Sequence, residues 1–244
     1  MSLTLRDCVA EFVDKPPGSI RVAMIHLRRA VEREPYVRAL EAAVATPLEI
    51  RDAAEGKALI AGGYPVECGI DPGVRRTAGE VGCAASHLEL IRSALADEAT
   101  SHLVVFEDDC VPSPGFDLGA LQEYLRRAKK FAADFSMSGM DELCLLSTCG
   151  CYKQRLLAPG LKATIHFNGA HAYIIGRSMM QKVVDFYATL AERSRTAPID
   201  GVLPVLLRRD RQWAFCPEKD TQFFQQNREI PSYIVSDGDA RRLD

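Results

Sequence analysis

The chain has 244 residues, 47% of them apolar, which is enough to bury one full hydrophobic core. Its 30 Lys and Arg residues nearly balance 33 Asp and Glu residues, and the formal net charge of −3 argues against a broad basic face for nucleic acid. No apolar run approaches the roughly 18 residues that a membrane-spanning helix needs, and the N-terminus lacks the pattern of a signal peptide. We therefore expect one cytoplasmic domain over residues 1–244, with residues 1–18 as an N-terminal extension, residues 235–244 as a tail, and neither a nucleic-acid partner nor an integral membrane segment.

The first half of the chain alternates predicted strands and helices. Residues 20–27 form a short apolar run that predicts a strand, and residues 28–44 follow with one apolar face typical of a helix. Residues 47–53 predict a second strand, whereas residues 55–78, which contain several glycines and prolines, lack periodicity and predict a loop. From residue 79 to residue 95, apolar residues recur every three or four positions, which predicts an amphipathic helix.

The second half continues this alternation. Residues 102–109 predict a strand that ends in acidic residues, residues 118–135 an amphipathic helix, and residues 143–147 a buried strand. Three further elements are predicted: a strand over 171–176, a helix over 177–193 and a short strand over 212–216. Residues 149–167 show no pattern that assigns them to a helix or a strand. Because strands that alternate with helices pair in parallel, the sequence predicts an α/β fold with a mainly parallel sheet flanked by helices.

The chain contains eight cysteines, which we expect to be reduced thiols because no secretion signal accompanies them. Cys144, Cys149 and Cys151 lie close together in the sequence, but no second C-x-x-C or H-x-x-x-H completes a tetrahedral zinc site. We interpret them as thiols at the end of a buried strand. A zinc-binding interaction module, with a histidine as the fourth ligand, is the alternative.

Three consecutive acids, Glu107, Asp108 and Asp109, form the most informative cluster, directly after the apolar residues 103–106. Two carboxylates about 4 Å apart repel by roughly 4 kcal/mol at an effective dielectric constant near 20, so the cluster is costly without a cation. If strand geometry continues, Glu107 and Asp109 point to one side and Asp108 to the other. Carboxylate oxygens suit Mg²⁺ or Mn²⁺, which would leave coordination positions for the two phosphates of a nucleotide. Alternatively, Asp108 or Asp109 caps a turn before Pro112.

Four segments of the chain share their order and spacing with a known family. They are MIHLRRAVER (24–33), GEVGCAASHLELI (79–91), LVVFEDDC (103–110), and NGAHAYIIGRSMMQK (168–182) followed by PIDGVL (198–203). Together they resemble glycosyltransferase family 25, the lipooligosaccharide-type β-glycosyltransferases related to collagen galactosyltransferases, although His26 stands where that family has Asn. The resemblance implies a GT-A type nucleotide-sugar-binding fold, inversion at the anomeric carbon, and a location in the cytoplasm or at the inner face of the membrane.

The resemblance and the residue chemistry together predict the metal ligands and the catalytic residues. Glu107 and Asp109 are expected to hold Mn²⁺ or Mg²⁺, with His171 as a third candidate ligand. Asp200, in the Pro-Ile-Asp-Gly turn, is the leading candidate for the base that takes the proton of the acceptor hydroxyl. In the alternative interpretation, Asp200 caps the short helix that follows. Glu80 is the second catalytic candidate, because its helix face is expected to edge the donor pocket.

The donor contacts are predicted from the same segments. The predicted donor-binding residues are Leu27, Arg33, Ser86, His87, Asp108 and Asn168. Leu27 and Arg33 are expected to approach the base and the ribose. Ser86 and His87 have an alternative role as a buried, hydrogen-bonded pair that supports the sheet. Gln222 resembles a family position near the C-terminus, with no role assigned.

The expected function is transfer of a hexose from a nucleotide sugar, with UDP-galactose as the preferred donor, to a hydroxyl of a glycan acceptor such as lipooligosaccharide. A non-catalytic nucleotide-sugar-binding or glycan-binding protein on the same fold is the alternative. The expected partners are the donor and the acceptor, and peripheral contact with the inner membrane is an open option.

Overall fold

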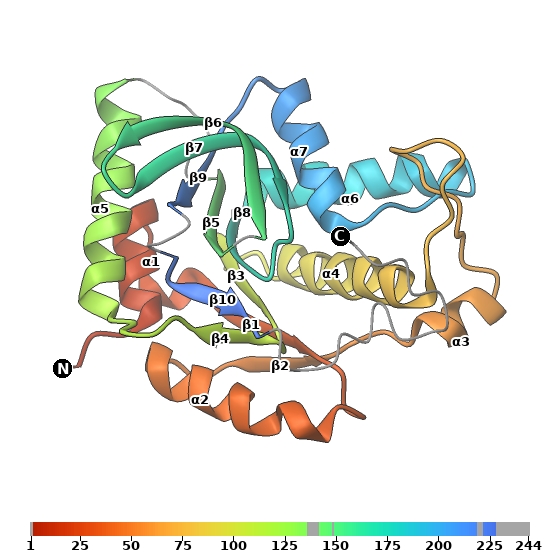
Figure 1. Ribbon diagram of the computed structural model, residues 1–244, viewed down its shortest axis with the longest axis horizontal. Coiled ribbons are helices and arrows are strands. Elements are labelled where there is room, and N and C mark those ends of the chain that lie inside the picture. Colours follow the sequence, from red (N-terminus) through yellow and green to blue (C-terminus); the bar gives the residue numbers. More distant parts are fainter. Residues whose placement is uncertain (1, 136–141, 148, 219–221, 228–244) are drawn as a thin grey trace.

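A mixed eight-stranded sheet forms the centre of the computed structural model, which describes residues 2–135, 142–147, 149–218 and 222–227 (Figure 1). The strand order is β2-β1-β3-β8-β5-β9-β7-β6. These strands are β1 (Ile20–His26), β2 (Glu49–Asp52), β3 (His102–Glu107), β5 (Leu143–Ser147), β6 (Gly150–Ala158), β7 (Leu161–Asn168), β8 (Ala172–Gly176) and β9 (Ala214–Pro217). The predicted tail, residues 235–244, lies outside the described residues.

The strand directions agree with the predicted α/β class. Strand β1 pairs in parallel with both β2 and β3, and β5 pairs in parallel with β9. Strands β8 and β7 are antiparallel to each of their neighbours. Among the eight strands, six therefore share one direction and two oppose it, so the expected mainly parallel sheet is confirmed. The antiparallel strands are confined to the second half of the chain.

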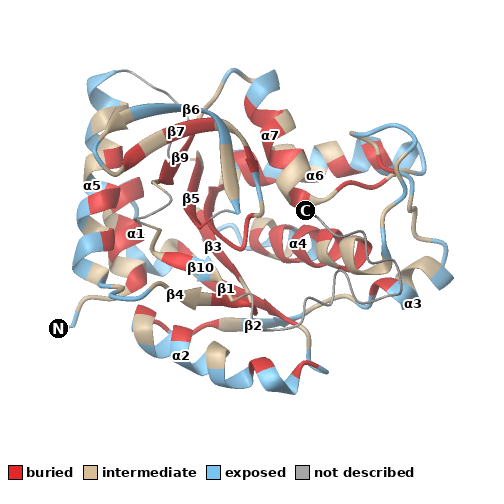
Figure 2. Cartoon of the chain, in the orientation of Figure 1, coloured by how far each residue is buried: buried red, intermediate tan, exposed pale blue. Residues whose placement is uncertain are grey.

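Helices cover both faces of the sheet (Figure 1). They are α1 (Leu5–Val13), α2 (Glu34–Val44), α3 (Gly56–Ala61), α4 (Ala78–Ala96), α5 (Leu118–Asp134), α6 (Arg177–Glu192) and α7 (Ile199–Arg209). Strand β3 shows how the two layers arise, because Val104 and Phe106 join the apolar cluster under α1 and α5, whereas Leu103 and Val105 join the cluster under α4, α6 and α7. Side chains alternate across a strand, so a strand buried on both faces contributes to two cores. Figure 2 shows the central strands buried along most of their length.

Two glycines bring the segment after β2 onto the N-terminal turns of α4. A Cβ on Gly56 would lie 1.7 Å from the carbonyl oxygen of Ala78, and a Cβ on Gly82 would lie 2.5 Å from that of Ala54. Both distances are far below a van der Waals contact, so only glycine permits this approach. The N-terminus of α4 is thereby held beside the carboxyl ends of β1 and β2.

Two segments differ from the sequence-based expectations, and a third contains a helix that the sequence pattern does not assign. Residues 55–78 are not a loop throughout, because α3 forms within them at Gly56–Ala61. Residues 149–167, which showed no pattern, form most of the antiparallel β6–β7 hairpin. The N-terminal extension contains α1, which starts with a capping box between Thr4 and Asp7 and packs into the core against α5. Local periodicity missed the hairpin because its outer strand is mostly exposed and unpatterned.

None of the helices in the described part of the chain is both long and apolar enough to cross a bilayer.

Candidate active site

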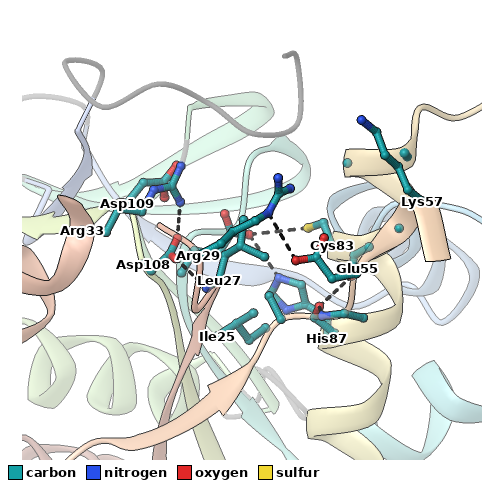
Figure 3. A pocket seen from close by; sticks show the side chains of 18 residues that line it. Ile25, Leu27, Arg29, Arg33, Glu55, Lys57, Cys83, His87, Asp108 and Asp109 are labelled. Carbon is teal, nitrogen blue, oxygen red and sulfur yellow. Dashed lines mark hydrogen bonds and ion pairs between the residues drawn. The ribbon is translucent and has the colours of Figure 1, made fainter. Parts of the chain in front are cut away.

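A cavity that is open to solvent lies at the carboxyl ends of β1, β2 and β3. It is lined by residues that follow each of these strands, by the first turns of α4, and by the three consecutive acids after β3. Figure 3 shows Arg33, Asp108 and Asp109 on one side of this cavity and Cys83 and His87 on the other. Ligands of α/β folds bind at this edge of the sheet.

Glu107 is held by a buried chain of side chains from α4 and β8. His87 Nε2 lies 3.1 Å from Glu107 Oε1, and His87 Nδ1 lies 2.9 Å from the hydroxyl oxygen of Tyr173. A carboxylate only accepts hydrogen bonds, so Nε2 donates to Glu107; in the neutral imidazole, Nδ1 then accepts from the Tyr173 hydroxyl. Burial acts to raise the pKa of Glu107, but the hydrogen bond from His87 and nearby basic side chains outweigh it and lower that pKa. Glu107 is therefore fixed in its ionised form.

Asp109 is held on its other side by the C-terminal strand β10 (Phe224–Gln226), which pairs with the short strand β4 (Cys110–Pro112). Gln226 Nε2 donates to Asp109 Oδ2 at 2.9 Å. The second carboxylate oxygen, Oδ1, is buried and has no hydrogen-bond partner in the described part of the chain. Burial and the neighbouring charge of Glu107 raise the pKa of Asp109 from 3.8 to about 6. A buried carboxylate oxygen without a partner is costly unless a cation or ligand occupies the space beside it.

Asp108 contacts a third element, the connection between β1 and α2. The backbone N–H of Leu27 donates to Asp108 Oδ2 at 2.9 Å, and His26 Nδ1 lies 3.0 Å from the same oxygen. Arg33 forms an ion pair with the other oxygen, and both charged side chains are buried. Asp108 lines the cavity, but its carboxylate is already engaged by the chain, and its clearest effect is to position Leu27 and Arg33. Leu27 and Arg33, which the sequence predicts as donor contacts, both line the cavity.

A second group of metal-ligating atoms surrounds Glu107. One donor atom each from Cys83, His87 and Glu107 lies within 4.8 Å of the others. Burial and the charges of Glu107, Asp200, Asp109 and Glu80 raise the pKa of the Cys83 thiol well above its usual value. Four carboxylates thus act on one half-buried thiol. The set predicted from the sequence, Glu107 with Asp109 and His171, does not form such a cluster among the described residues.

Three residues predicted for the site on α4 have structural contacts. Ser86 Oγ accepts from the backbone N–H of Ala54 and donates to the carbonyl of Gly82, so it ties the cavity wall to α4. Ser86 and His87 are therefore both satisfied, but by other partners rather than by each other. Glu80 closes the capping box of α4 with Thr77 and pairs with Arg76. Its carboxylate serves the helix terminus, and Glu80 is not among the residues that line the cavity.

The remaining predicted residues meet on the side of β7, β8 and α7. Asp200 lies in the first turn of α7, after the N-cap residue Pro198, so it does not act as the N-cap. Its Oδ2 accepts the backbone N–H of Gly169 at 2.9 Å, and Gly169 has a φ of +67°. The carbonyl of His171 accepts the backbone N–H of Glu107 at 2.9 Å, which ties this side to the acids. Asn168 is exposed at the end of β7.

Sequence reasoning missed two residues that the structure places near the acids, Tyr173 and Gln226, whereas Cys149 is one of the thiols of the zinc-binding alternative. Tyr173 and Gln226 contact His87 and Asp109 as described above, and Cys149 Sγ lies 4.0 Å from His171 Nδ1. Gln222, the C-terminal residue that the sequence suggested, instead accepts from Ser147. No local signal distinguishes Gln226 from Gln222, because strand pairing over more than a hundred residues decides which one reaches the acids.

The α/β architecture, with acids and a cavity at the carboxyl ends of parallel strands, is consistent with a GT-A-like fold. The chain belongs to glycosyltransferase family 25, described as LPS biosynthesis protein, since the model of that family matches residues 21–203. The match includes every predicted site residue, whereas Gln226 lies beyond its end. Among curated proteins, none matched the chain.

Proposed function

We propose that this protein is a metal-dependent hexosyltransferase that binds a nucleotide-sugar donor in the cavity beside Glu107 and Asp109. The observation that supports the proposal most directly is the buried, unpartnered Oδ1 of Asp109 next to the Glu107 carboxylate. Two carboxylates with one such oxygen fit a hard divalent cation, because Mg²⁺ and Mn²⁺ prefer oxygen ligands and retain open positions for phosphate. Glu107 and Asp109 would hold the ion, with His171 as a further candidate.

The cavity wall offers contacts for each part of the donor. Leu27 and Arg33, held by Asp108, would contact the base and ribose. Arg29 and Lys57 also line the cavity and carry the positive charge that a diphosphate requires. The first turns of α4 add backbone N–H groups at a helix N-terminus. UDP-galactose is the proposed donor. His26, which stands at the position where the family has Asn, contacts Asp108 and directly precedes Leu27, the proposed contact to the base.

Asp200 is the proposed base for an inverting transfer. When bound, the cation would neutralise the charge that develops on the leaving nucleotide diphosphate. The acceptor hydroxyl oxygen forms a bond to the anomeric carbon as the bond from that carbon to the diphosphate oxygen breaks, and the hydroxyl proton passes to the Asp200 carboxylate. The hydrogen bond from Gly169 holds Asp200 Oδ2 and orients the carboxylate. Attack from the face opposite the leaving group inverts the configuration.

The acceptor side is formed by exposed elements. Asn168, which the sequence predicts as a donor contact, does not line the cavity; because it and Gly169 lie beside Asp200, we instead assign them to acceptor binding. The proposed acceptor is a glycan hydroxyl such as one on lipooligosaccharide, in keeping with the description of the family. We place the reaction in the cytoplasm, with peripheral contact with the inner face of the membrane where a lipid-linked acceptor would be reached.

A donor screen tests this proposal. The protein is combined with each nucleotide sugar and Mn²⁺, Mg²⁺ or EDTA, and both melting temperature and donor hydrolysis are measured. A ligand that binds only the folded state at 100 times its Kd stabilises it by about 2.7 kcal/mol, which is several degrees in melting temperature. Stabilisation and turnover by one donor, dependent on metal and lost in Asp109→Ala, would support the transferase. Stabilisation without turnover toward any glycan acceptor would favour the nucleotide-sugar-binding alternative.

A further inference from the structure

The C-terminal strand β10 brings a polar side chain to the acidic cluster from a part of the chain beyond the family match. Gln226 Nε2 donates to Asp109 Oδ2 at 2.9 Å, and the backbone N–H of Asn227 donates to the carbonyl of Asp109 at 2.7 Å. Both the side chain and the backbone of Asp109 are thus held by consecutive residues of one segment. Asp109 is therefore fixed by contacts from another segment of the chain and not only by its position after β3.

The segment that carries Gln226 is anchored in the core. Strand β10 pairs with β4 in antiparallel register, and the buried ring of Phe224 lies 5.1 Å from that of Phe106 and 4.9 Å from that of Phe116. Side chains two residues apart point to the same side of a strand, so Gln226 shares the inward side with Phe224 while Gln225 faces away and is exposed. The position of the Gln226 amide is therefore fixed by packing.

The orientation of the Gln226 amide follows from its two partners. Cys149 Sγ lies 3.5 Å from Gln226 Oε1 and can donate to it, while the nitrogen faces the carboxylate of Asp109. Because a carboxylate has no proton to donate, the NH₂ group must be the one that faces it. The amide thus uses its oxygen and its nitrogen for different neighbours, which leaves one orientation.

We propose that Gln226 is a positioning residue for the metal-facing oxygen of Asp109, an inference that rests on the proposed metal role of that acid. By holding Oδ2, Gln226 directs Oδ1, which is buried without a partner among the described residues, toward the space next to Glu107. Partners that orient a ligating carboxylate commonly affect metal affinity by about 10–100-fold. Gln226 does not contact the reacting atoms, so its effect is on the ion rather than on the chemical step.

The test compares Gln226→Met with Gln225→Met on the full chain. Methionine keeps the length of the side chain and removes the donor, and the neighbouring position controls for a change on the same strand. The affinity for Mn²⁺ is measured by electron paramagnetic resonance without any sugar. We expect about 10–100-fold weaker Mn²⁺ binding in Gln226→Met and wild-type affinity in Gln225→Met. In transfer assays, the Mn²⁺ concentration for half-maximal rate should rise while kcat at saturating Mn²⁺ stays near wild type.

The outcomes separate this inference from the function on which it rests. If the wild type binds Mn²⁺, Asp109→Asn does not, and Gln226→Met binds as tightly as the wild type, the positioning role is overturned while the metal role stands. If the wild type binds no Mn²⁺, both fail together. Gln226→Ala serves as a second variant, and circular dichroism confirms that each protein is folded. A fall in kcat with unchanged Mn²⁺ affinity would also overturn the inference.

Discussion

The two sides of the candidate active site are assembled in different ways. The cavity side is formed by successive strand–helix units, because its residues follow β1, β2 and β3 or lie on α4 directly before β3. The opposite side gathers Gly169 and His171 from the connection between β7 and β8, Asp200 from α7 and Gln226 from the C-terminal strand β10. Parallel strands place their carboxyl ends at one edge automatically, whereas the second side depends on contacts between distant segments. We therefore expect substitutions on the cavity side to lower the stability of the fold most strongly. Substitutions on the opposite side should mainly displace the side chains of the site.

Removing Asp108 should have the largest effect on stability. Asp108→Ala leaves Arg33 buried without its ion-pair partner and removes the acceptor for Leu27, so we expect a loss of about 3–5 kcal/mol in the free energy of unfolding. The matched control is Arg28→Ala, which breaks an exposed pair with Asp52 and should cost no more than about 1 kcal/mol. Urea unfolding measures both. Equal losses would show that the Asp108 network does not support the cavity side.

Removing the charge of Asp109 should stabilise the metal-free protein. The pKa of Asp109 is about 6 in the folded chain against 3.8 as the ordinary value, so the folded state binds more protons between these values. Stability therefore falls as pH rises from about 4 to about 6, by up to roughly 3 kcal/mol, and the loss persists at pH 7. Asp109→Asn cannot ionise, so in EDTA it should lack this slope and exceed the wild type in stability above pH 6.

The measurement for Asp109→Asn is the melting temperature across pH 4–8, in EDTA and with Mn²⁺. Mn²⁺ should raise the melting temperature of the wild type and leave that of the variant unchanged. A variant that is less stable than the wild type in EDTA at pH 7 would contradict the view that function, rather than folding, requires this carboxylate.

The same division explains what the sequence could predict. The strands and helices around the cavity have clear apolar periodicity, and the three acids follow a run of residues buried on both faces of the sheet. The family resemblance predicts Leu27 and Arg33 as donor contacts, and the position of Glu107 after a buried run predicts it as a metal ligand. The β6–β7 hairpin and Gln226 could not be predicted, because an exposed outer strand carries little periodicity and the pairing of β10 with β4 joins residues more than a hundred positions apart.

Glu80 illustrates a different limit. Its place on the helix was predicted correctly, but Glu at the third position of a helix that starts after Thr also completes a capping box. The two roles use the same carboxylate, and spacing alone does not distinguish them. The structure assigns that carboxylate to Thr77 and Arg76.

A methyl group at Gly169 should disturb the opposite side at moderate cost. Gly169 has a φ of +67°, and a Cβ there would lie 2.6 Å from Cys149 Sγ, whereas Gly160 has a φ of +75° with no atom within 4 Å of its Cβ position. Gly160→Ala therefore measures backbone strain alone, about 1–2 kcal/mol. Gly169→Ala adds overpacking of typically 1–3 kcal/mol and shifts the N–H that holds Asp200.

The kinetic effect of Gly169→Ala separates the two sides directly. We expect a lower kcat and a raised KM for the acceptor with the KM for the donor near wild type, because the displaced groups lie beside Asp200 and not in the cavity. Gly160→Ala should leave all three constants unchanged. A raised KM for the donor in Gly169→Ala would mean that the two sides do not act on separate substrates.

The smallest expected effect concerns Cys83 and distinguishes two sets of metal ligands that share Glu107. If the oxygen pair of Glu107 and Asp109 holds the catalytic ion, Cys83→Ser should leave Mn²⁺ affinity within about twofold and weaken Zn²⁺ binding by about tenfold, since thiolate favours Zn²⁺ over harder ions. Cys8→Ser, which alters a buried thiol on α1, is the control for loss of a thiol from the core. Isothermal titration with each ion gives both affinities. A parallel loss of Mn²⁺ affinity would assign the ion to Cys83, His87 and Glu107, and Asp109 would then face the donor rather than the metal.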